Sequence, residues 1–113
     1  MVIKIFKPVG ILDRIQAKKL HLEVDNAIKA GSKIALIDMQ AVTLIDSSAL
    51  GELVVLLKAI RTKDGKLCFC SVGQQPKMVF ELTGMEKVFH IFSDQEAFHQ
   101  HQIAINPEHH LLR

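Results

Sequence analysis

The chain reads Ile45-Asp46-Ser47-Ser48-Ala49-Leu50-Gly51 at the point where an apolar, strand-like segment gives way to an amphipathic helix. The first turn of a helix has unpaired backbone N–H groups and the positive end of the helix dipole. A hydroxyl held there is well placed to carry a phosphate, because the local field tolerates the added negative charge. The stretch therefore predicts a phosphorylation switch at Ser47 rather than a catalytic centre.

A plainer interpretation is that these residues only cap the helix. Asp and Ser are preferred N-cap residues, and one cap stabilises a helix by about 1 kcal/mol. A cap needs one side-chain oxygen, whereas Asp46, Ser47 and Ser48 together offer three side chains that could supply it. This surplus favours the switch, and simple capping remains the alternative.

The composition indicates one globular domain with no nucleic-acid surface. The 113 residues suffice for a single core, and 49% of them are apolar. Fourteen basic and twelve acidic residues leave a formal net charge of +2, and the basic residues are scattered along the chain. Six Phe, with no Trp or Tyr, supply the aromatic character. We therefore expect no direct contact with nucleic acid.

The sequence also favours a cytoplasmic protein without a membrane partner. The N-terminal residues lack the apolar core and cleavage site of a signal peptide, and the apolar run 53–57 is too short to span a bilayer. Cys68 and Cys70 lie two apart in an expected strand, an arrangement unsuited to a disulfide between them. Buried free thiols in a reducing cytoplasm are the consistent interpretation.

The apolar periodicity predicts alternating strands and helices. Strands are expected over residues 2–6, 33–39, 66–72 and 88–92, and helices over about 15–30, 47–63, 76–84 and 94–101. Residues 10–13 are interpreted as a short extended piece and 42–45 as a linker. Capping boxes are expected at Asp13 with Gln16 and at Ser93 with Glu96.

These elements predict an α/β fold. Strands separated by helices imply right-handed crossovers and a mainly parallel sheet. We expect one domain over residues 1–102, with a four- to five-stranded, mainly parallel or mixed sheet packed with about four helices. Residues 103–113 are expected to form a polar C-terminal tail. Met78, Met85 and the four Phe residues from 80 to 98 are expected mostly in the core.

The histidines do not predict a metal site. His99 and His101 diverge around the expected last helix, and no carboxylate or thiol stands at ligand spacing from them. The spacing of Cys68 and Cys70 also differs from that of a redox Cys-x-x-Cys pair. No metal, cofactor or catalytic residue is predicted.

Several motifs together resemble the STAS domains of bacterial anti-sigma factor antagonists, over about residues 2–100. The resemblance rests above all on the stretch 46–51. Four further segments add to it, namely Gly10-Ile11-Leu12-Asp13, Leu36-Ile37-Asp38, Lys66-Leu67 and Phe80-Glu81-Leu82-Thr83-Gly84. None of these motifs would suffice alone.

The resemblance implies a partner-switching role. In that family the unphosphorylated protein binds an anti-sigma factor that is also a serine kinase, which frees a sigma factor. The kinase phosphorylates the serine after the motif aspartate, here Ser47, and a metal-dependent serine phosphatase reverses the modification. The residues thereby implied in partner binding are Asp13, Asp46, Ser47, Ser48, Ala49, Leu50 and Gly51. The resemblance also implies that Asp46 helps to shape the loop and that the neighbouring Ser48 can bond the partner.

The chain departs from the family pattern in two ways. Ala49 stands where glycine is usual, and its methyl group is expected to fit the helix but to hinder close approach of a partner backbone. The chain also begins at what is usually the second strand. Residues 2–6 thus become a candidate sheet edge, protected by Lys4 and Lys7. A weak homodimer through this edge is a hypothesis.

Two other functions remain as alternatives. A small enzyme with Ser47 as nucleophile lacks a base with suitable sequence context and a Gly-x-Ser-x-Gly motif. A ligand-sensing or scaffolding module of the same fold, not regulated by phosphorylation, is compatible with the fold but has no Gly-rich phosphate loop to support it.

Overall fold

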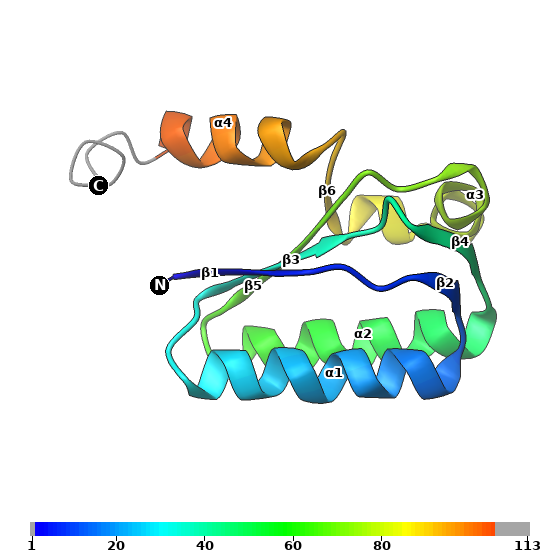
Figure 1. Ribbon diagram of the computed structural model, residues 1–113, viewed down its shortest axis with the longest axis horizontal. Helices are drawn as coiled ribbons and strands as arrows, with labels where there is room; N and C mark the ends of the chain where they lie inside the picture. Colours follow the sequence, from blue (N-terminus) through cyan, green and yellow to red (C-terminus); the bar gives the residue numbers. More distant parts are fainter. Residues whose placement is uncertain (1, 106–113) are drawn as a thin grey trace.

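The computed structural model describes residues 2–105 and contains a four-stranded parallel sheet (Figure 1). Its strands, in spatial order, are β1 (Ile3–Phe6), β3 (Ile34–Asp38), β5 (Lys66–Cys70) and β6 (His90–Phe92). The central strand β3 carries a run of apolar residues because both of its faces are covered. The mainly parallel α/β sheet predicted from the sequence is confirmed, and β1 is an edge strand among the described residues.

A second, two-stranded sheet corrects one prediction. Residues 42–45, interpreted from the sequence as a linker, form β4 (Val42–Ile45), which pairs in parallel with β2 (Gly10–Leu12). The burial along β4 does not alternate, since Val42 and Ile45 are buried and the two residues between them are exposed. The local pattern therefore lacked the usual strand period, and pairing with a distant segment decided the structure.

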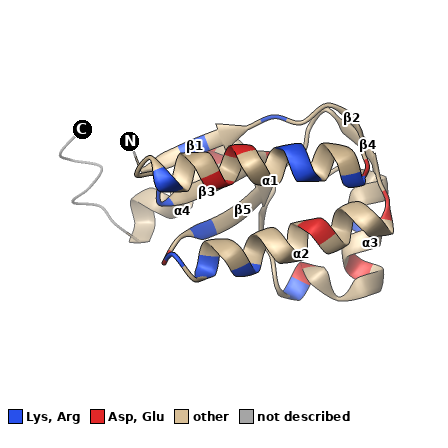
Figure 2. Ribbon diagram, turned by 90° about the horizontal axis from the view of Figure 1, so that it is seen from below, with Lys and Arg blue, Asp and Glu red and all other residues tan. Residues whose placement is uncertain are grey.

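Helices cover both faces of the larger sheet (Figure 1). Two of them, α1 (Arg14–Lys29) and α2 (Ser47–Arg61), lie side by side on one face. On the opposite face lies α4 (Gln95–Ile105), while α3 (Gln74–Thr83) lies beside β4. Seen from below, α1 and α2 carry basic and acidic segments interspersed along their length (Figure 2).

The main core lies between the sheet and the α1–α2 pair. Its centre includes three aromatic rings, of Phe69, Phe80 and Phe89, with centroids 4.8 to 5.7 Å apart. A smaller cluster on the other face joins Leu36, the two cysteines and Phe98. Both cysteines are free and buried, as predicted. Met78, expected in the core, is 49% exposed, because it lies on the outer side of α3.

Element ends differ from the prediction where local backbone geometry intervenes. The strand β5 ends at Cys70, two residues early, because Ser71 adopts a left-handed conformation with φ of 54°. A short 3-10 helix, η1 (Met85–Lys87), precedes β6, so that β6 begins only at His90.

The last helix also differs from its prediction. Asp94, rather than Ser93, caps α4, because its carboxylate accepts a hydrogen bond from the backbone N–H of Ala97 at 2.7 Å. The helix continues to Ile105 rather than ending near His101. The remainder of the predicted tail, 106–113, lies outside the described residues, and the division of the chain at 102 stays a prediction.

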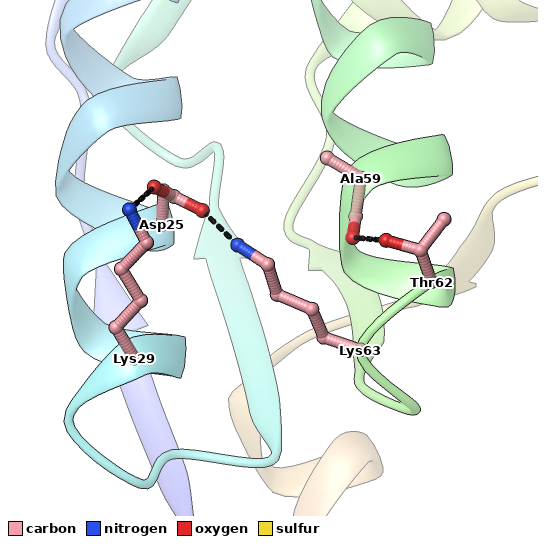
Figure 3. Close-up of polar contacts among 5 residues, drawn as sticks. All are labelled: Asp25, Lys29, Ala59, Thr62 and Lys63. Atoms are coloured by element: carbon pink, nitrogen blue, oxygen red, sulfur yellow. Dashed lines mark hydrogen bonds and ion pairs between the residues drawn. The ribbon is translucent and has the colours of Figure 1, made fainter.

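An ion-pair cluster joins α1 to the end of α2 (Figure 3). The Asp25 carboxylate accepts hydrogen bonds from Lys63, beyond the C-terminus of α2, and from Lys29, one turn along α1 at 2.9 Å. Beside it, the Thr62 hydroxyl donates to the Ala59 carbonyl at 2.7 Å and closes the last turn of α2. The Lys63 and Lys29 ammonium groups lower the pKa of Asp25 from its ordinary 3.8 to about 2.

This lowered pKa predicts a loss of stability in acid. The folded protein binds a proton at Asp25 more weakly than the unfolded chain does, so the stabilisation is complete above about pH 4 and disappears as the pH falls toward 2. We expect Asp25→Asn to lower the urea midpoint at pH 7 but not at pH 2. Asp64→Asn, at an exposed turn residue without an ion pair among residues 2–105, should change neither midpoint.

Candidate functional site

Asp46 caps α2 by itself. Its backbone is extended, with φ of −99° and ψ of 172°, and its Oδ1 atom accepts a hydrogen bond from the backbone N–H of Ala49 at 2.8 Å. The Asp46 carbonyl accepts the first helical bond, from the Leu50 N–H at 3.1 Å. These are the contacts of an N-cap residue, so capping alone does not explain the two serines that follow.

Ser47 and Ser48 occupy the first two positions of α2, and both are exposed. Neither hydroxyl makes a hydrogen bond to another residue in the range 2–105. The backbone N–H groups of this first turn lack helical partners and bear partial positive charge. Two free hydroxyls therefore stand at the positive end of a fifteen-residue helix.

The site is held in place by two neighbouring segments. Gln75, in the first turn of α3, clamps the end of β4: its Nε2 donates to the Ile45 carbonyl at 3.1 Å, and its Oε1 accepts from the Ile45 N–H at 2.9 Å. From the other side, the Leu12 carbonyl of β2 accepts a bond from the Asp46 N–H at 3.4 Å. No local pattern indicated a role for Gln75, because thirty residues separate it from Ile45.

The structure brings Asp13 to the same end of the small sheet as Asp46. Leu12 of β2 is in register with Ile45 of β4, and each is followed directly by an aspartate. Asp13 caps α1 as predicted, since its Oδ1 accepts from the Gln16 N–H at 2.9 Å. Two helix N-termini and their acidic caps thus lie next to each other.

Comparison with known proteins matches residues 2–97 to the STAS domain. The chain belongs to the STAS domain family. In sequence it is 24% identical, over 78% of its length and 76% of the relative, to a protein of Bordetella bronchiseptica provisionally named anti-sigma factor antagonist BtrV.

Solved structures share the fold. One is a protein of Thermotoga maritima provisionally described as an anti-sigma factor antagonist (TM-score 0.75, 24% identity, 87% of this chain and 86% of that one). Another is the unphosphorylated form of SpoIIAA, a Bacillus cell fate determinant and anti-sigma factor antagonist (TM-score 0.67, 14% identity, 89% of this chain and 90% of that one). A third is a sulfate transporter family protein of Wolinella succinogenes (TM-score 0.76, 15% identity, 86% of this chain and 81% of that one).

Not all the motif residues of this STAS domain reach the surface. The side chains of Ala49 and Leu50 are 0% and 8% exposed and pack in the main core. The Ala49 methyl group therefore lies in the core rather than on the surface, and the part of Ala49 in partner binding stays a prediction. Gly51 is exposed, and a Cβ atom built on it would meet nothing within 4 Å.

Apolar side chains near this turn went unnoticed in the sequence. Ile11 and Leu44 lie side by side in the β2–β4 register and are 58% and 45% exposed. Val9, just before β2, is 76% exposed. Exposed apolar side chains grouped in this way are typical of a contact surface. The pairing of Ile11 with Leu44 becomes evident only once β4 is known to be a strand.

Within residues 2–105 no three His, Cys, Asp or Glu side chains are grouped closely enough to hold a metal ion. The same part of the chain contains no helix that is both long and apolar enough to cross a membrane. A catalytic role for Ser47 would require a base such as histidine. His21, on α1, contacts the Glu52 carboxylate through its Nδ1 at 3.2 Å rather than Ser47.

Proposed function

We propose that this STAS domain is a cytoplasmic anti-sigma factor antagonist that acts by binding rather than by catalysis. Unphosphorylated, it binds an anti-sigma factor that is a serine kinase, and phosphorylation of Ser47 ends the complex. A metal-dependent serine phosphatase restores the binding form. The observation that carries the proposal is the exposed Ser47 hydroxyl, left without a bond among the described residues because Asp46 provides the cap.

Electrostatics explains how a phosphate there separates two proteins without unfolding one. Phosphorylation adds about −1.5 to −2 charges at neutral pH. The N-terminus of α2 favours this charge by about 1 kcal/mol, while the neighbouring Asp46 carboxylate opposes it by a similar amount. The two effects nearly cancel within the domain, so the phosphate acts mainly on the partner.

The surface around Ser47 supports a protein partner. Asp13, Ser48 and Gly51 lie around the first turns of α1 and α2, with Ile11 and Leu44 on the adjoining strands. Apolar side chains of this kind supply binding energy, and the polar ones set orientation and charge. The names of the sequence relative and of two solved neighbours support an anti-sigma factor as that partner.

The direct test is phosphorylation in a lysate of the source organism with ATP. We expect the wild-type protein to gain one phosphate, localised to Ser47 by fragment mass spectrometry. Ser48→Ala should still be modified, and Ser47→Ala should not. If the wild-type mass stays unchanged under conditions that phosphorylate other proteins in the lysate, or if Ser48 alone is modified, the proposed switch is wrong.

A substitution at Gly51 separates folding from partner binding. Gly51→Ala should raise the free energy of unfolding by about 0.5–1 kcal/mol, because alanine is the better helix former and the position has open space. The added methyl group should weaken binding of the captured kinase, measured by surface plasmon resonance. Unchanged affinity would place Gly51 outside the contact.

A ligand-sensing or scaffolding role is the second candidate, and the shared fold with a sulfate transporter family protein favours considering it. In that case small anions or nucleotides should raise the melting temperature by mass action, equally in the wild type and in Ser47→Ala. No shift is expected if Ser47 phosphorylation is the switch.

The free edge of β1 (Ile3–Phe6) supports the hypothesis of a weak homodimer, and exposed Lys4 on the same strand opposes it. Light scattering after size exclusion at high protein concentration distinguishes a monomer from a homodimer. A monomer at every concentration would eliminate the dimer.

A further inference from the structure

Among residues 2–105, helix α4 is attached to its face of the sheet mainly by Phe98, and the ring of its His101 lies beside the Phe92 ring of β6, 5.2 Å between centroids. Phe98 is the one residue of α4 that is fully buried, and it packs on Leu36, Cys68 and Cys70. The Phe92 ring borders it, edge to face, at 5.4 Å between centroids. Counted over residues 2–105, this cluster has four buried residues, whereas the core on the α1–α2 face has twenty. The cover over this face is therefore much the weaker of the two.

Within the described part of the chain, a hydrogen bond from α4 to the end of β3 completes the attachment. Gln95, at the start of α4, donates from Nε2 to the Asp38 carboxylate at 2.8 Å. Asp38 is the one buried charged side chain among residues 2–105, and its other oxygen accepts from the Gln40 N–H at 3.0 Å. Removing Gln95 would leave this buried carboxylate short of one partner, which favours separation of α4 from the sheet.

Two thiols lie beneath this cover. Cys68 and Cys70 are 3% and 0% exposed and follow each other on the same face of β5. Burial raises the pKa of both thiols to about 11, so the closed form presents almost no thiolate. The bonds that hold β5 in the sheet run to β3 and β6 and do not involve α4. The strand can therefore keep its place when α4 leaves.

We propose that Cys68 and Cys70 form a covered modification site for low-molecular-weight disulfides, reached when α4 lifts from the sheet while the rest of the domain stays folded. Elements held by few buried contacts open at a lower free-energy cost than the whole domain. The site is independent of Ser47 and of the function proposed above.

The chemistry is thiol–disulfide exchange. In the open form a cysteine loses its proton to solvent, and its thiolate attacks one sulfur of the reagent's disulfide. A mixed disulfide forms, the reagent's own S–S bond breaks, and the other half leaves as a thiolate. The protein sulfur is oxidised and the departing half is reduced. The attached group then occupies the position of Phe98, which keeps α4 from returning.

The probe is Ellman's reagent, an aromatic disulfide, applied to the full wild-type chain in urea below the unfolding transition. We expect the rate of labelling to rise with urea much less steeply than the equilibrium constant for global unfolding, which is measured in parallel. A labelling rate that rises with urea as steeply as the equilibrium constant for global unfolding would overturn the proposal. So would immediate labelling at the rate of a free thiol, since no cover would then exist.

Two glutamine variants test the part played by α4. Gln95→Ala should speed labelling about ten- to a hundredfold, because a hydrogen bond to a charged group contributes about 1.5–3 kcal/mol and 1.4 kcal/mol corresponds to tenfold. Gln75→Ala, which loses two hydrogen bonds to Ile45 of β4 and none to α4, is the matched control, with an expected change below about twofold at equal distance from the unfolding midpoint. Equal rates in the two variants would contradict the role of α4.

Glutathione disulfide then shows whether a natural type of disulfide reacts. We expect the intact mass of the wild type to increase by one glutathione. The variants Cys68→Ala and Cys70→Ala then show which sulfur carries the adduct. An adduct that is absent from native protein but forms in denaturant would overturn modification of the folded domain.

Discussion

Phosphorylation of Ser47 should lower the affinity for the proposed anti-sigma factor partner by about a thousandfold while leaving the free energy of unfolding nearly unchanged. Like charges brought together across an interface cost several kcal/mol, and each 1.4 kcal/mol is a tenfold change in affinity. Within the domain the dipole of α2 and the Asp46 carboxylate act in opposite directions. Isothermal titration with phosphoserine incorporated at position 47, together with urea unfolding, measures both quantities.

The position of the charge is the control. Phosphoserine at Ser93, an exposed residue in the connection to α4, should change the affinity by less than about threefold if the effect is local to α2. Ser47→Ala should bind constitutively and Ser47→Asp weakly. Equal affinities for the phosphorylated and unphosphorylated forms would remove Ser47 as the switch, even if a kinase modifies it.

The second large effect is expected in the core. Phe69→Ala should lower the free energy of unfolding by about 3–5 kcal/mol, because Phe69 is 0% exposed and packs against the rings of Phe80 and Phe89. Truncation would leave a cavity where β5 meets Phe80 of α3 and Phe89, the residue before β6. Such a loss is a large fraction of the 5–15 kcal/mol that is typical of a domain. Urea unfolding followed by circular dichroism measures it.

Leu82→Ala is the matched truncation outside the core. Leu82 is 81% exposed on α3, so its removal should change the free energy of unfolding by less than about 0.5 kcal/mol. A similar loss in both variants would mean that the aromatic cluster does not carry the stability assigned to it.

Local signals in the sequence were enough to place the helices and the ends that carry the site. Asp13 was predicted as the cap of α1, and residues 46–48 together as the start of α2. Asp13 and Asp46 each accept a hydrogen bond from the backbone N–H three residues ahead. Such contacts span a single turn, so they can be inferred from neighbouring residues. At α4 the same reasoning selected Ser93 as the cap, whereas Asp94 is the cap in the structure. Both residue types can cap a helix, so the backbone path determines which of the two does so.

Contacts between distant segments could not be inferred in this way. The pairing of β4 with β2 joins residues about thirty positions apart, and the clamp of Gln75 on Ile45 spans thirty more. The inward direction of Ala49 also depended on the packing of α2 against the sheet. None of these features leaves a periodic or compositional trace in its own segment.

The sequence by itself determined the alternating α/β plan and the place of Ser47 at the start of a helix, because periodicity and capping act over a few residues. Only the tertiary structure decided that Asp46 supplies the cap, that neither serine hydroxyl has a hydrogen-bond partner among residues 2–105, and that Ile11 pairs with Leu44. These outcomes depend on which distant segments meet. Their free energies come from burial and pairing that exist only in the assembled fold.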